Sequence, residues 1–274
     1  MHTTSDPTQK PVRRSLHGDG VELSCLDFGG AGPPVLLLHG LAGHAGEWRE
    51  TASWLTRRHR VFALDERGHG HSTRAPGDVS PEARVADVAL VIEELAGEAT
   101  ALIGQSLGAN LAFLTAARHP ALVRALVVAE GYAGADPEGE GAAAIDRWLA
   151  SWPMPFAARE DAVAFFGGSL RGEAWADGLE QRQDGLWPRF ERDVIVRMLR
   201  EGTARERWSE WEQIDCPTLV LRAGAGYFAA ADLEAMAALI SRGRYGEIDG
   251  AGHDLHLERP EAWRRLLEDF LTRS

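Results

Sequence analysis

Short runs of consecutive apolar residues alternate along this chain with longer segments whose apolar positions lie three and four residues apart. Continuous apolar runs are typical of strands buried on both faces of a parallel sheet, and the wider spacing is typical of helices with one buried face. Strands are therefore predicted at 21–28, 35–38, 60–65, 99–104, 122–128, 217–221 and 244–248, and helices at 45–58, 83–95, 107–118, 231–241 and 260–271. Because the two kinds alternate, we expect an α/β fold whose mostly parallel central sheet carries helices on both faces.

The alternation stops at Gly131 and resumes near Ile214. The intervening segment has helical but irregular patterning and contains six of the nine tryptophans of the chain. An insertion at this point would lie over the carboxyl edge of the sheet, so we expect a helical cap at 133–213 and an α/β core at 13–132 and 214–274. Residues 1–12 are polar and are expected to form a flexible leader. Most cap tryptophans are expected to pack together, with one or two facing a substrate, because ligand sites are lined mainly by apolar side chains.

Composition narrows the expected partners. The 274-residue chain has a net charge of −12, and nucleic acids and anionic membrane surfaces repel an acidic protein. No apolar stretch approaches the length of a membrane span, and the N-terminus lacks the apolar centre of a signal peptide. The two cysteines have neither metal nor redox spacing. We expect a cytoplasmic protein without metal or cofactor that binds neither nucleic acid nor membrane; the sequence leaves the oligomeric state open.

The sequence Gly104-Gln105-Ser106-Leu107-Gly108 is the strongest chemical signal in the chain. It joins an expected strand to an expected helix, which is the context in which a G-x-S-x-G motif forms a sharp turn that projects a nucleophilic serine. Glycines flank such a turn because larger side chains would collide with the neighbouring strand and helix. Ser106 is therefore the expected nucleophile, and it needs a base within hydrogen-bond reach.

Other segments, together with this turn, resemble the α/β-hydrolase superfamily in type, order and spacing. They are the strand at 35–38 with His39-Gly40 after it, the loop at 65–72, and Gly250-Ala251-Gly252-His253 near the C-terminus. The resemblance covers about residues 20–132 and 214–272. It implies the superfamily's fold and a hydrolytic activity without a cofactor.

The resemblance also implies roles for individual residues. His253 lies in a glycine-rich loop after the last strand, where the superfamily has its base. The backbone N–H groups of Leu41 and Leu107 occupy the positions of the oxyanion hole, and Gly40 is expected beside the substrate. His69 and His71 form an H-x-H pair without a third ligand nearby, so we expect them to shape their loop rather than to bind a metal.

The acid of the expected triad departs from the common pattern of the superfamily. The acid usually follows the strand expected at 217–221, but no carboxylate follows that strand before Asp232, which begins a helix. Glu130 ends the strand after the nucleophile helix, where some haloalkane dehalogenases and zearalenone-type lactonases of the superfamily have their acid. We expect Glu130 to pair with His253; bonding of Glu130 to backbone amides alone is the alternative. Asp232 is expected to interact with its helix dipole.

A serine nucleophile favours transfer of an acyl group to water and excludes mechanisms that need an aspartate at this position. The expected partner is a small apolar ester or lactone. The position of the acid resembles that of lactonases acting on zearalenone-like resorcylic macrolides, in which a cap tryptophan contacts the substrate; Trp187 is at the matching distance beyond the nucleophile. Three alternatives stay open: a broad carboxylesterase for small esters, a cofactor-free perhydrolase, and a ligand receptor on the same fold.

Overall fold

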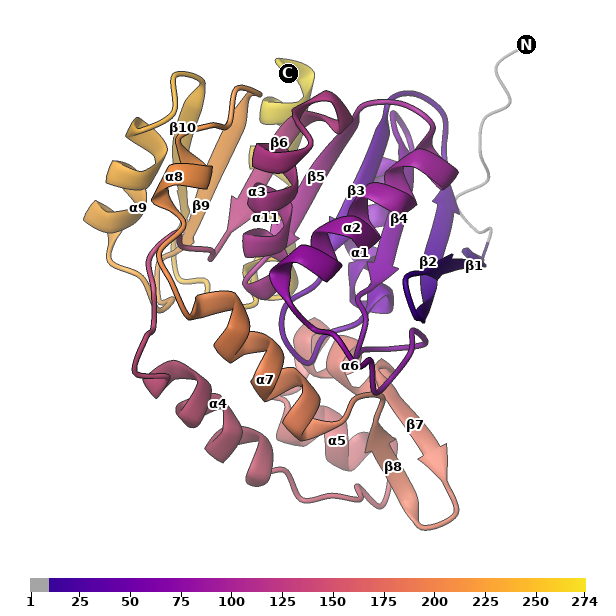
Figure 1. Cartoon of the computed structure of the whole chain (residues 1–274). Coiled ribbons are helices and arrows are strands. Elements are labelled where there is room, and N and C mark those ends of the chain that lie inside the picture. The colour runs from indigo at the N-terminus through magenta and orange to yellow at the C-terminus, as the bar shows by residue number, and fades with distance from the viewer. Residues whose placement is uncertain (1–9) are drawn as a thin grey trace.

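The computed structural model describes residues 10–274, and a single eight-stranded sheet forms its centre (Figure 1). The strand order is β1-β2-β4-β3-β5-β6-β9-β10. The pairs β1–β2 and β2–β4 are antiparallel and all other neighbours are parallel. The strands are β1 (Val12–Gly18), β2 (Val21–Gly29), β3 (Pro34–Leu38), β4 (Arg60–Asp65), β5 (Thr100–Gln105), β6 (Val123–Ala129), β9 (Thr218–Ala223) and β10 (Gly243–Ile248). The expected α/β fold with a mostly parallel sheet is confirmed.

Helices connect the parallel strands or follow the last of them, and the longer ones begin close to where the sequence predicts them. Ser80 caps the second of them, because its hydroxyl accepts a hydrogen bond from the N–H of Ala83 and Pro81 occupies the first turn. These helices are α1 (Arg49–Leu55), α2 (Pro81–Val91), α3 (Leu107–Arg118), α9 (Ala230–Ala238), α10 (Leu255–Glu258) and α11 (Pro260–Thr272), with the short helical turns η1 (Ala45–Trp48), η2 (Ile92–Ala96) and η3 (Pro120–Leu122).

Two differences from the sequence analysis concern the ends of elements. The helix predicted at 45–58 is divided into η1 and α1 and ends at Leu55. Val12 already begins β1, a strand that the polar sequence did not predict and that pairs along its whole length with β2. Residues 1–9, which make up most of the expected leader, lie outside the described residues.

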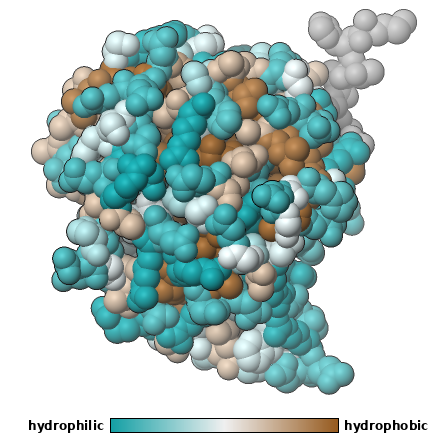
Figure 2. Space-filling model, in the orientation of Figure 1, coloured by the Kyte–Doolittle hydropathy of each residue, from teal (hydrophilic) through white to brown (hydrophobic). Residues whose placement is uncertain are grey.

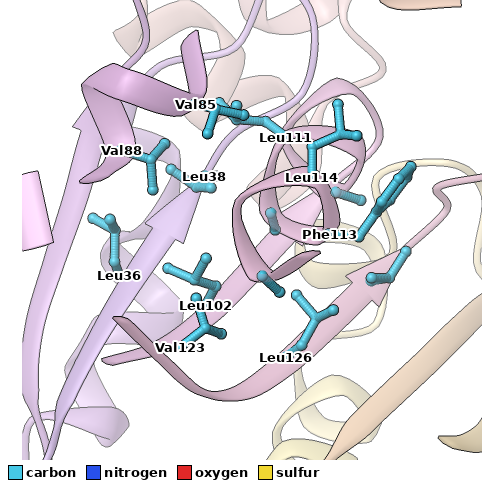
Figure 3. Close-up of a cluster of buried hydrophobic side chains, with 14 of the residues drawn as sticks. Leu36, Leu38, Val85, Val88, Leu102, Leu111, Phe113, Leu114, Val123 and Leu126 are labelled. Atoms are coloured by element: carbon cyan, nitrogen blue, oxygen red, sulfur yellow. The ribbon is translucent and has the colours of Figure 1, made fainter. Parts of the chain in front are cut away.

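Each central strand sends alternate side chains into two separate cores. On β3, Leu36 and Leu38 face one core while Val35 and Leu37 face the other, and all four are buried. The first core lies between the sheet and the helices α2, α3 and α9, as Figure 3 shows for the first two of these helices. The second lies between the sheet and the helices α1 and α11. Burial on both faces is the physical reason for the continuously apolar strands.

Most of the chain between β6 and β9, residues 140–203, forms a helical layer at the carboxyl edge of the sheet, drawn below the sheet in Figure 1. We call residues 133–213 the inserted segment. Trp148, Trp152 and Trp175 pack edge to face there, with ring centroids 5.1–5.9 Å apart. Trp211, by contrast, is buried in the first core against Phe113 of α3. Its elements are α4 (Glu140–Ala150), α5 (Arg159–Phe165), α6 (Ser169–Asp177), the hairpin β7 (Leu179–Arg182) and β8 (Gly185–Pro188), α7 (Arg192–Thr203) and α8 (Trp208–Trp211).

The surface is mainly polar on the face drawn in Figure 2, where apolar residues form scattered areas between hydrophilic ones. Among residues 10–274, no helix combines the length and apolar character that crossing a membrane requires. Cys25 is buried and Cys216 is half-buried, and both are free thiols.

Candidate active site

Ser106 occupies the turn between β5 and α3, and its backbone is strained. Its φ is 53° and its ψ is −118°, a combination that residues with a Cβ rarely adopt. The turn leaves no room for side chains on either side: a Cβ on Gly104 would lie 2.3 Å from the carbonyl oxygen of Gly108, and a Cβ on Gly108 would lie 2.4 Å from that of Leu38. The local sequence therefore accounts for a sharp turn that presents the Ser106 hydroxyl at the carboxyl edge of the sheet.

Glu130 and His253 meet at this edge although they are far apart in the sequence. His253 Nδ1 lies 3.2 Å from Glu130 Oε2, which is hydrogen-bond distance. The Glu130 side chain is fully buried, whereas 27% of the His253 side chain is exposed. Because a carboxylate only accepts hydrogen bonds, we assign the proton of the neutral imidazole to Nδ1. The outer nitrogen, Nε2, is then an acceptor that can take a proton.

Backbone amides from the loop after β9 surround the Glu130 carboxylate. The N–H of Ala223 donates to Oε1 at 2.8 Å, and the N–H of Tyr227 donates to Oε2 at 3.3 Å. Gly226 packs so closely that a Cβ there would lie 2.3 Å from Oε2. These donors offset the cost of burying an ionised carboxylate. Asp232 is in the first turn of α9, as expected from the sequence.

The loop that presents His253 is anchored on both sides. Gln105, the residue before Ser106, donates its side-chain N–H to the carbonyl of His253 at 2.9 Å. On the other side, Trp175 of α6 donates its indole N–H to Asp254 Oδ2 at 3.1 Å. Burial raises the pKa of the Asp254 carboxyl, and the Trp175 donor acts in the opposite direction. The inserted segment thus contacts the residue next to His253.

Two further contacts join α6 to the same region of the core. His44 Nε2 lies 2.9 Å from the carbonyl oxygen of Ala174. Arg171 forms an ion pair with Glu258 at 3.4 Å, and Glu258 in turn accepts a hydrogen bond from the N–H of Gly252. With the contact to Asp254, these interactions hold α6 against the loop on either side of His253.

The loop after β3 contains Leu41, and α3 begins at Leu107; these are the two residues whose amides are expected to form the oxyanion hole. Ala42 has a φ of 63°, and its N–H donates to His69 Nε2 at 3.2 Å. Burial lowers the pKa of His69 well below 6.5, so the imidazole is neutral and free to accept this bond. Among residues 10–274, no acceptor takes a hydrogen bond from the N–H of Leu41 or of Leu107. A Cβ on Gly40 would lie 3.3 Å from Cβ of Ser106, so this loop runs directly beside the nucleophile.

His39 also contacts the backbone of this loop. Its Nε2 accepts a hydrogen bond from the N–H of Glu66 at 3.1 Å, which assigns the ring proton to Nδ1, and Nδ1 lies 2.8 Å from the carbonyl oxygen of Gly40. Asp65 fixes the neighbouring turn because its carboxylate accepts hydrogen bonds from the N–H groups of Ala45 and His71. The two imidazoles of His39 and His69 therefore act on the backbone of this loop.

Trp187 is the expected site residue that the structure does not bring to the others. It lies on β8, where its indole N–H donates to Asp184 at 2.8 Å and the Arg182 guanidinium lies 5.3 Å from its ring. Within the described part of the chain, no hydrogen bond or aromatic contact joins it to Ser106 or His253. Its expected contact with a substrate stays a prediction.

The sequence analysis missed Trp175 and Tyr227, whose rings lie beside the candidate site. The Tyr227 ring centroid is 4.7 Å from that of His253, and 76% of Tyr227 is exposed. In the sequence, Trp175 looks like the other tryptophans of its segment. No local pattern shows that this tryptophan contacts the loop of His253. In the described chain, no three His, Cys, Asp or Glu side chains are grouped to hold a metal ion.

Comparison with known proteins relates most of the chain to one family. A family model described as the alpha/beta hydrolase fold matches residues 33–260. The chain is 28% identical over 268 residues to a 2-succinyl-6-hydroxy-2,4-cyclohexadiene-1-carboxylate synthase of Bacillus subtilis, covering 93% of this chain and 96% of that protein. It is also 34% identical over 120 residues to the carbamate hydrolase RutD of Azorhizobium caulinodans. This match covers 44% of this chain and only 45% of that protein.

The fold is also that of solved structures. The crystal structure of an E-2-(acetamidomethylene)succinate hydrolase superposes with a TM-score of 0.86 and 22% identity, covering 96% of this chain and 99% of that one. At this identity the likeness concerns the fold.

Proposed function

The chain belongs to the alpha/beta hydrolase fold family, and we propose that it is a serine hydrolase that cleaves carboxylic esters through an acyl-enzyme on Ser106. The observation that carries the proposal is the contact of 3.2 Å between His253 Nδ1 and the buried Glu130 carboxylate. It supports the presence of an oriented base at the edge of the sheet where the strained Ser106 turn projects its hydroxyl. A nucleophile, a base and an acid that orients the base are the parts that acyl transfer requires.

In this proposal His253 Nε2 takes the proton of the Ser106 hydroxyl as the oxygen attacks the carbonyl carbon of the ester. The N–H groups of Leu41 and Leu107 donate to the oxyanion that forms. His253 then gives its proton to the leaving alcohol, which departs and leaves the acyl group on Ser106. A water molecule, deprotonated by the same Nε2, then attacks the acyl carbon. The bond to Ser106 breaks, the acid is released, and Ser106 takes the proton back from His253. Glu130 accepts the hydrogen bond from the N–H at Nδ1 throughout and stabilises the imidazolium.

The substrate class is the less constrained part of the proposal. The names of the relatives include a synthase and a carbamate hydrolase. Membership of the family therefore does not identify which bond of a substrate this protein cleaves. The expected partner remains a small apolar ester. Val194 and Met198 of α7 pack with Leu107 in one apolar cluster, with the half-buried Leu41 against it. These side chains favour an acyl or alkyl group over a charged one at this side of Ser106.

A lactone is the second candidate, and the position of the acid favours it. Glu130 follows β6, as the acid does in the zearalenone-type lactonases that the sequence resembles. Hydrolysis of a lactone uses the same residues and leaves both products on one molecule. A carboxylic acid and an alcohol on one opened ring would distinguish this reaction from cleavage of an open-chain ester.

The proposed function also assigns a role to each part of the chain. We regard 13–132 and 214–274 as the catalytic core and 133–213 as a cap that covers the carboxyl edge. The contacts of Trp175 and Arg171 with Asp254 and Glu258 support a cap that acts on the loop of His253.

Turnover of a chromogenic ester by the purified protein tests the proposal. The wild type is expected to hydrolyse p-nitrophenyl butyrate and to be labelled at Ser106 by a fluorophosphonate. Ser106→Ala is expected to lose turnover by about 10⁴- to 10⁶-fold, because the nucleophile is gone and only the oxyanion hole and substrate binding remain. Hydrolysis at the wild-type rate by Ser106→Ala would refute the serine mechanism.

Comparing that ester with zearalenone at matched concentrations separates the two candidates. A higher kcat/KM for zearalenone supports the lactonase, and a higher value for the ester supports the carboxylesterase. Binding of either molecule without any turnover would favour the receptor alternative, and turnover only with added hydrogen peroxide would favour the perhydrolase.

A further inference from the structure

A second candidate site lies at the opposite edge of the sheet from Ser106. A groove of about 230 Å³ opens there, lined by Ala116, Pro120, Val123, Arg124, Asp215, Cys216 and Arg242. Val123 begins β6, Cys216 lies two residues before β9, and Arg242 directly precedes β10. The amino ends of parallel strands share one edge, so this groove lies at the edge of the sheet opposite to the one that carries Ser106.

Arg124 is the unusual residue of this groove. Its Nε and Nη2 atoms are inaccessible to solvent and have no hydrogen-bond partner among residues 10–274. The buried guanidinium groups of Arg67 and Arg84, by comparison, contact the carboxylates of Asp87 and Glu66 at 2.6 Å. A buried polar group without a partner is costly, and such groups are rare in native proteins.

The charges around Arg124 do not neutralise it. Burial lowers the pKa of Arg124, and Glu98 opposes this through its charge without forming an ion pair. Arg242, also on the groove, has no ion pair or side-chain hydrogen bond in the described chain and is exposed. Burial lowers the pKa of His59, and the positive charges of Arg124 and Arg58 also lower it. His59 therefore adds no positive charge. Asp215 is the one carboxylate among the residues that line the described groove.

We propose that this groove binds a phosphate group, held by the guanidinium groups of Arg124 and Arg242. The exposed Arg242 guanidinium can donate paired hydrogen bonds to an oxyanion, and Arg124 adds its charge and its Nη1 donor, which is not among its buried atoms. Such charged hydrogen bonds are stronger than those between neutral groups. The volume suffices, since one water molecule in the liquid takes only about 30 Å³. Asp215 repels a fully deprotonated anion but accepts a hydrogen bond from one that keeps a hydroxyl. Hydrogen phosphate keeps one at neutral pH and sulfate does not, so the groove favours phosphate.

Calorimetric titration with inorganic phosphate at constant ionic strength tests this site. The wild type is expected to bind phosphate at a single site and more tightly than sulfate. Arg124→Gln is expected to weaken binding by about tenfold or more, as for the loss of a charged hydrogen bond. Arg242→Gln should weaken it by a smaller factor, because that side chain is exposed. Arg265→Gln, which removes an exposed arginine of α11 outside the groove, is the matched control and should bind like the wild type.

Titration with a phosphomonoester, glycerol 3-phosphate, shows which source of phosphate the groove takes: tighter binding than inorganic phosphate identifies a phosphorylated small molecule, and weaker binding identifies the free ion. Absence of phosphate binding by the wild type, or equal binding by Arg124→Gln, would overturn the proposal.

Thermal unfolding provides an independent measurement. Without phosphate, Arg124→Gln is expected to have a Tm equal to or above that of the wild type, because an unpaired guanidinium is removed. Phosphate is expected to raise the Tm of the wild type and of Arg265→Gln but not that of Arg124→Gln. An equal rise in all three proteins would mean a general salt effect and would also overturn the site.

Discussion

At the scale of single residues, the candidate triad depends on how a buried carboxylate is accommodated. Glu130 accepts hydrogen bonds from the N–H groups of Ala223 and Tyr227 and from His253, and its own backbone has a φ of 53°. Both carboxylate oxygens therefore accept hydrogen bonds. Because Gly226 has no side chain, it leaves the space that the carboxylate occupies. The loop after β9, which lacks the usual acid, instead supplies donors to an acid from the neighbouring strand.

Glu130→Gln is expected to lower kcat by up to about 10⁴-fold, because an amide N–H facing His253 favours the wrong imidazole tautomer. It also leaves one of the two backbone donors without an acceptor, which costs about 1–3 kcal/mol of unfolding free energy. Ester turnover and urea unfolding of the same preparation separate the two effects. Asp232→Asn is the control and should retain near-normal activity. The assignment of Glu130 would be wrong if Asp232→Asn were the inactive variant.

His69 makes stability depend on pH. Burial lowers its pKa well below the ordinary 6.5, so between these two values the unfolded state binds more protons than the folded state. Stability therefore rises with pH in this window and falls as the pH drops below about 6.5, by at most about 1.4 kcal/mol per pH unit for one group. In His69→Gln this contribution is expected to vanish, while the amide oxygen can still accept the N–H of Ala42.

Urea unfolding between about pH 5 and pH 7 measures this difference. His17→Gln, an exposed histidine on β1, is the control and should keep the pH dependence of the wild type. An unchanged slope in His69→Gln would show that the pKa of His69 is not lowered in the folded protein.

At the scale of elements, helix α6 and the loop at 252–258 behave as one unit. The helix contacts the loop through Trp175 and Arg171, and it contacts the core through the carbonyl of Ala174. The other side of the loop is held by Gln105, next to the nucleophile. The position of His253 therefore depends on an element of the inserted segment as well as on the sheet.

Trp175→Phe is expected to lower kcat about tenfold with a small change in stability, because it removes only the N–H that binds Asp254 and small displacements of a base are costly. Steady-state kinetics with p-nitrophenyl butyrate and thermal unfolding check both parts. Trp148→Phe is the matched control, since Trp148 belongs to the same aromatic cluster and is partly exposed. Equal kinetics for the two variants would mean that α6 does not position the loop.

At the scale of the whole molecule, the two edges of the sheet differ in chemistry. The carboxyl edge has the candidate triad under the inserted segment, and the amino edge has the groove with Arg124 and Arg242. The molecule as a whole carries a net charge of −12, so its long-range field repels anions that approach either edge.

This field predicts a salt dependence that differs between substrates. For an anionic ester, kcat/KM is expected to rise a few-fold as salt is added, because the Debye length falls from about 30 Å at 0.01 M to about 10 Å at 0.1 M and repulsion is screened. A neutral ester of the same chain length should show little change. Initial rates at low substrate concentration measure both. A fall in kcat/KM for the anionic ester would indicate a local cationic group near Ser106 that outweighs the net charge.

Local patterns in the sequence predict the elements and the nucleophile turn. Apolar runs and helical spacing are local properties, so β3, β4, α3 and α11 lie close to their predicted positions, and Gly104 and Gly108 predict the sharp turn at Ser106 through the space that a Cβ would need. The sequence did not predict β1, because this polar strand is stabilised by pairing with β2 and not by an apolar pattern of its own.

Only the tertiary structure decided which distant groups meet. Strand order brings β6 between β5 and β9, and this places the Glu130 carboxylate within reach of His253 and of the Ala223 and Tyr227 amides. It also decided that Trp175, rather than Trp187, contacts the loop of His253. The physical reason is that such contacts depend on the packing of helices and loops far apart in the chain, which no local pattern of apolar and polar residues encodes.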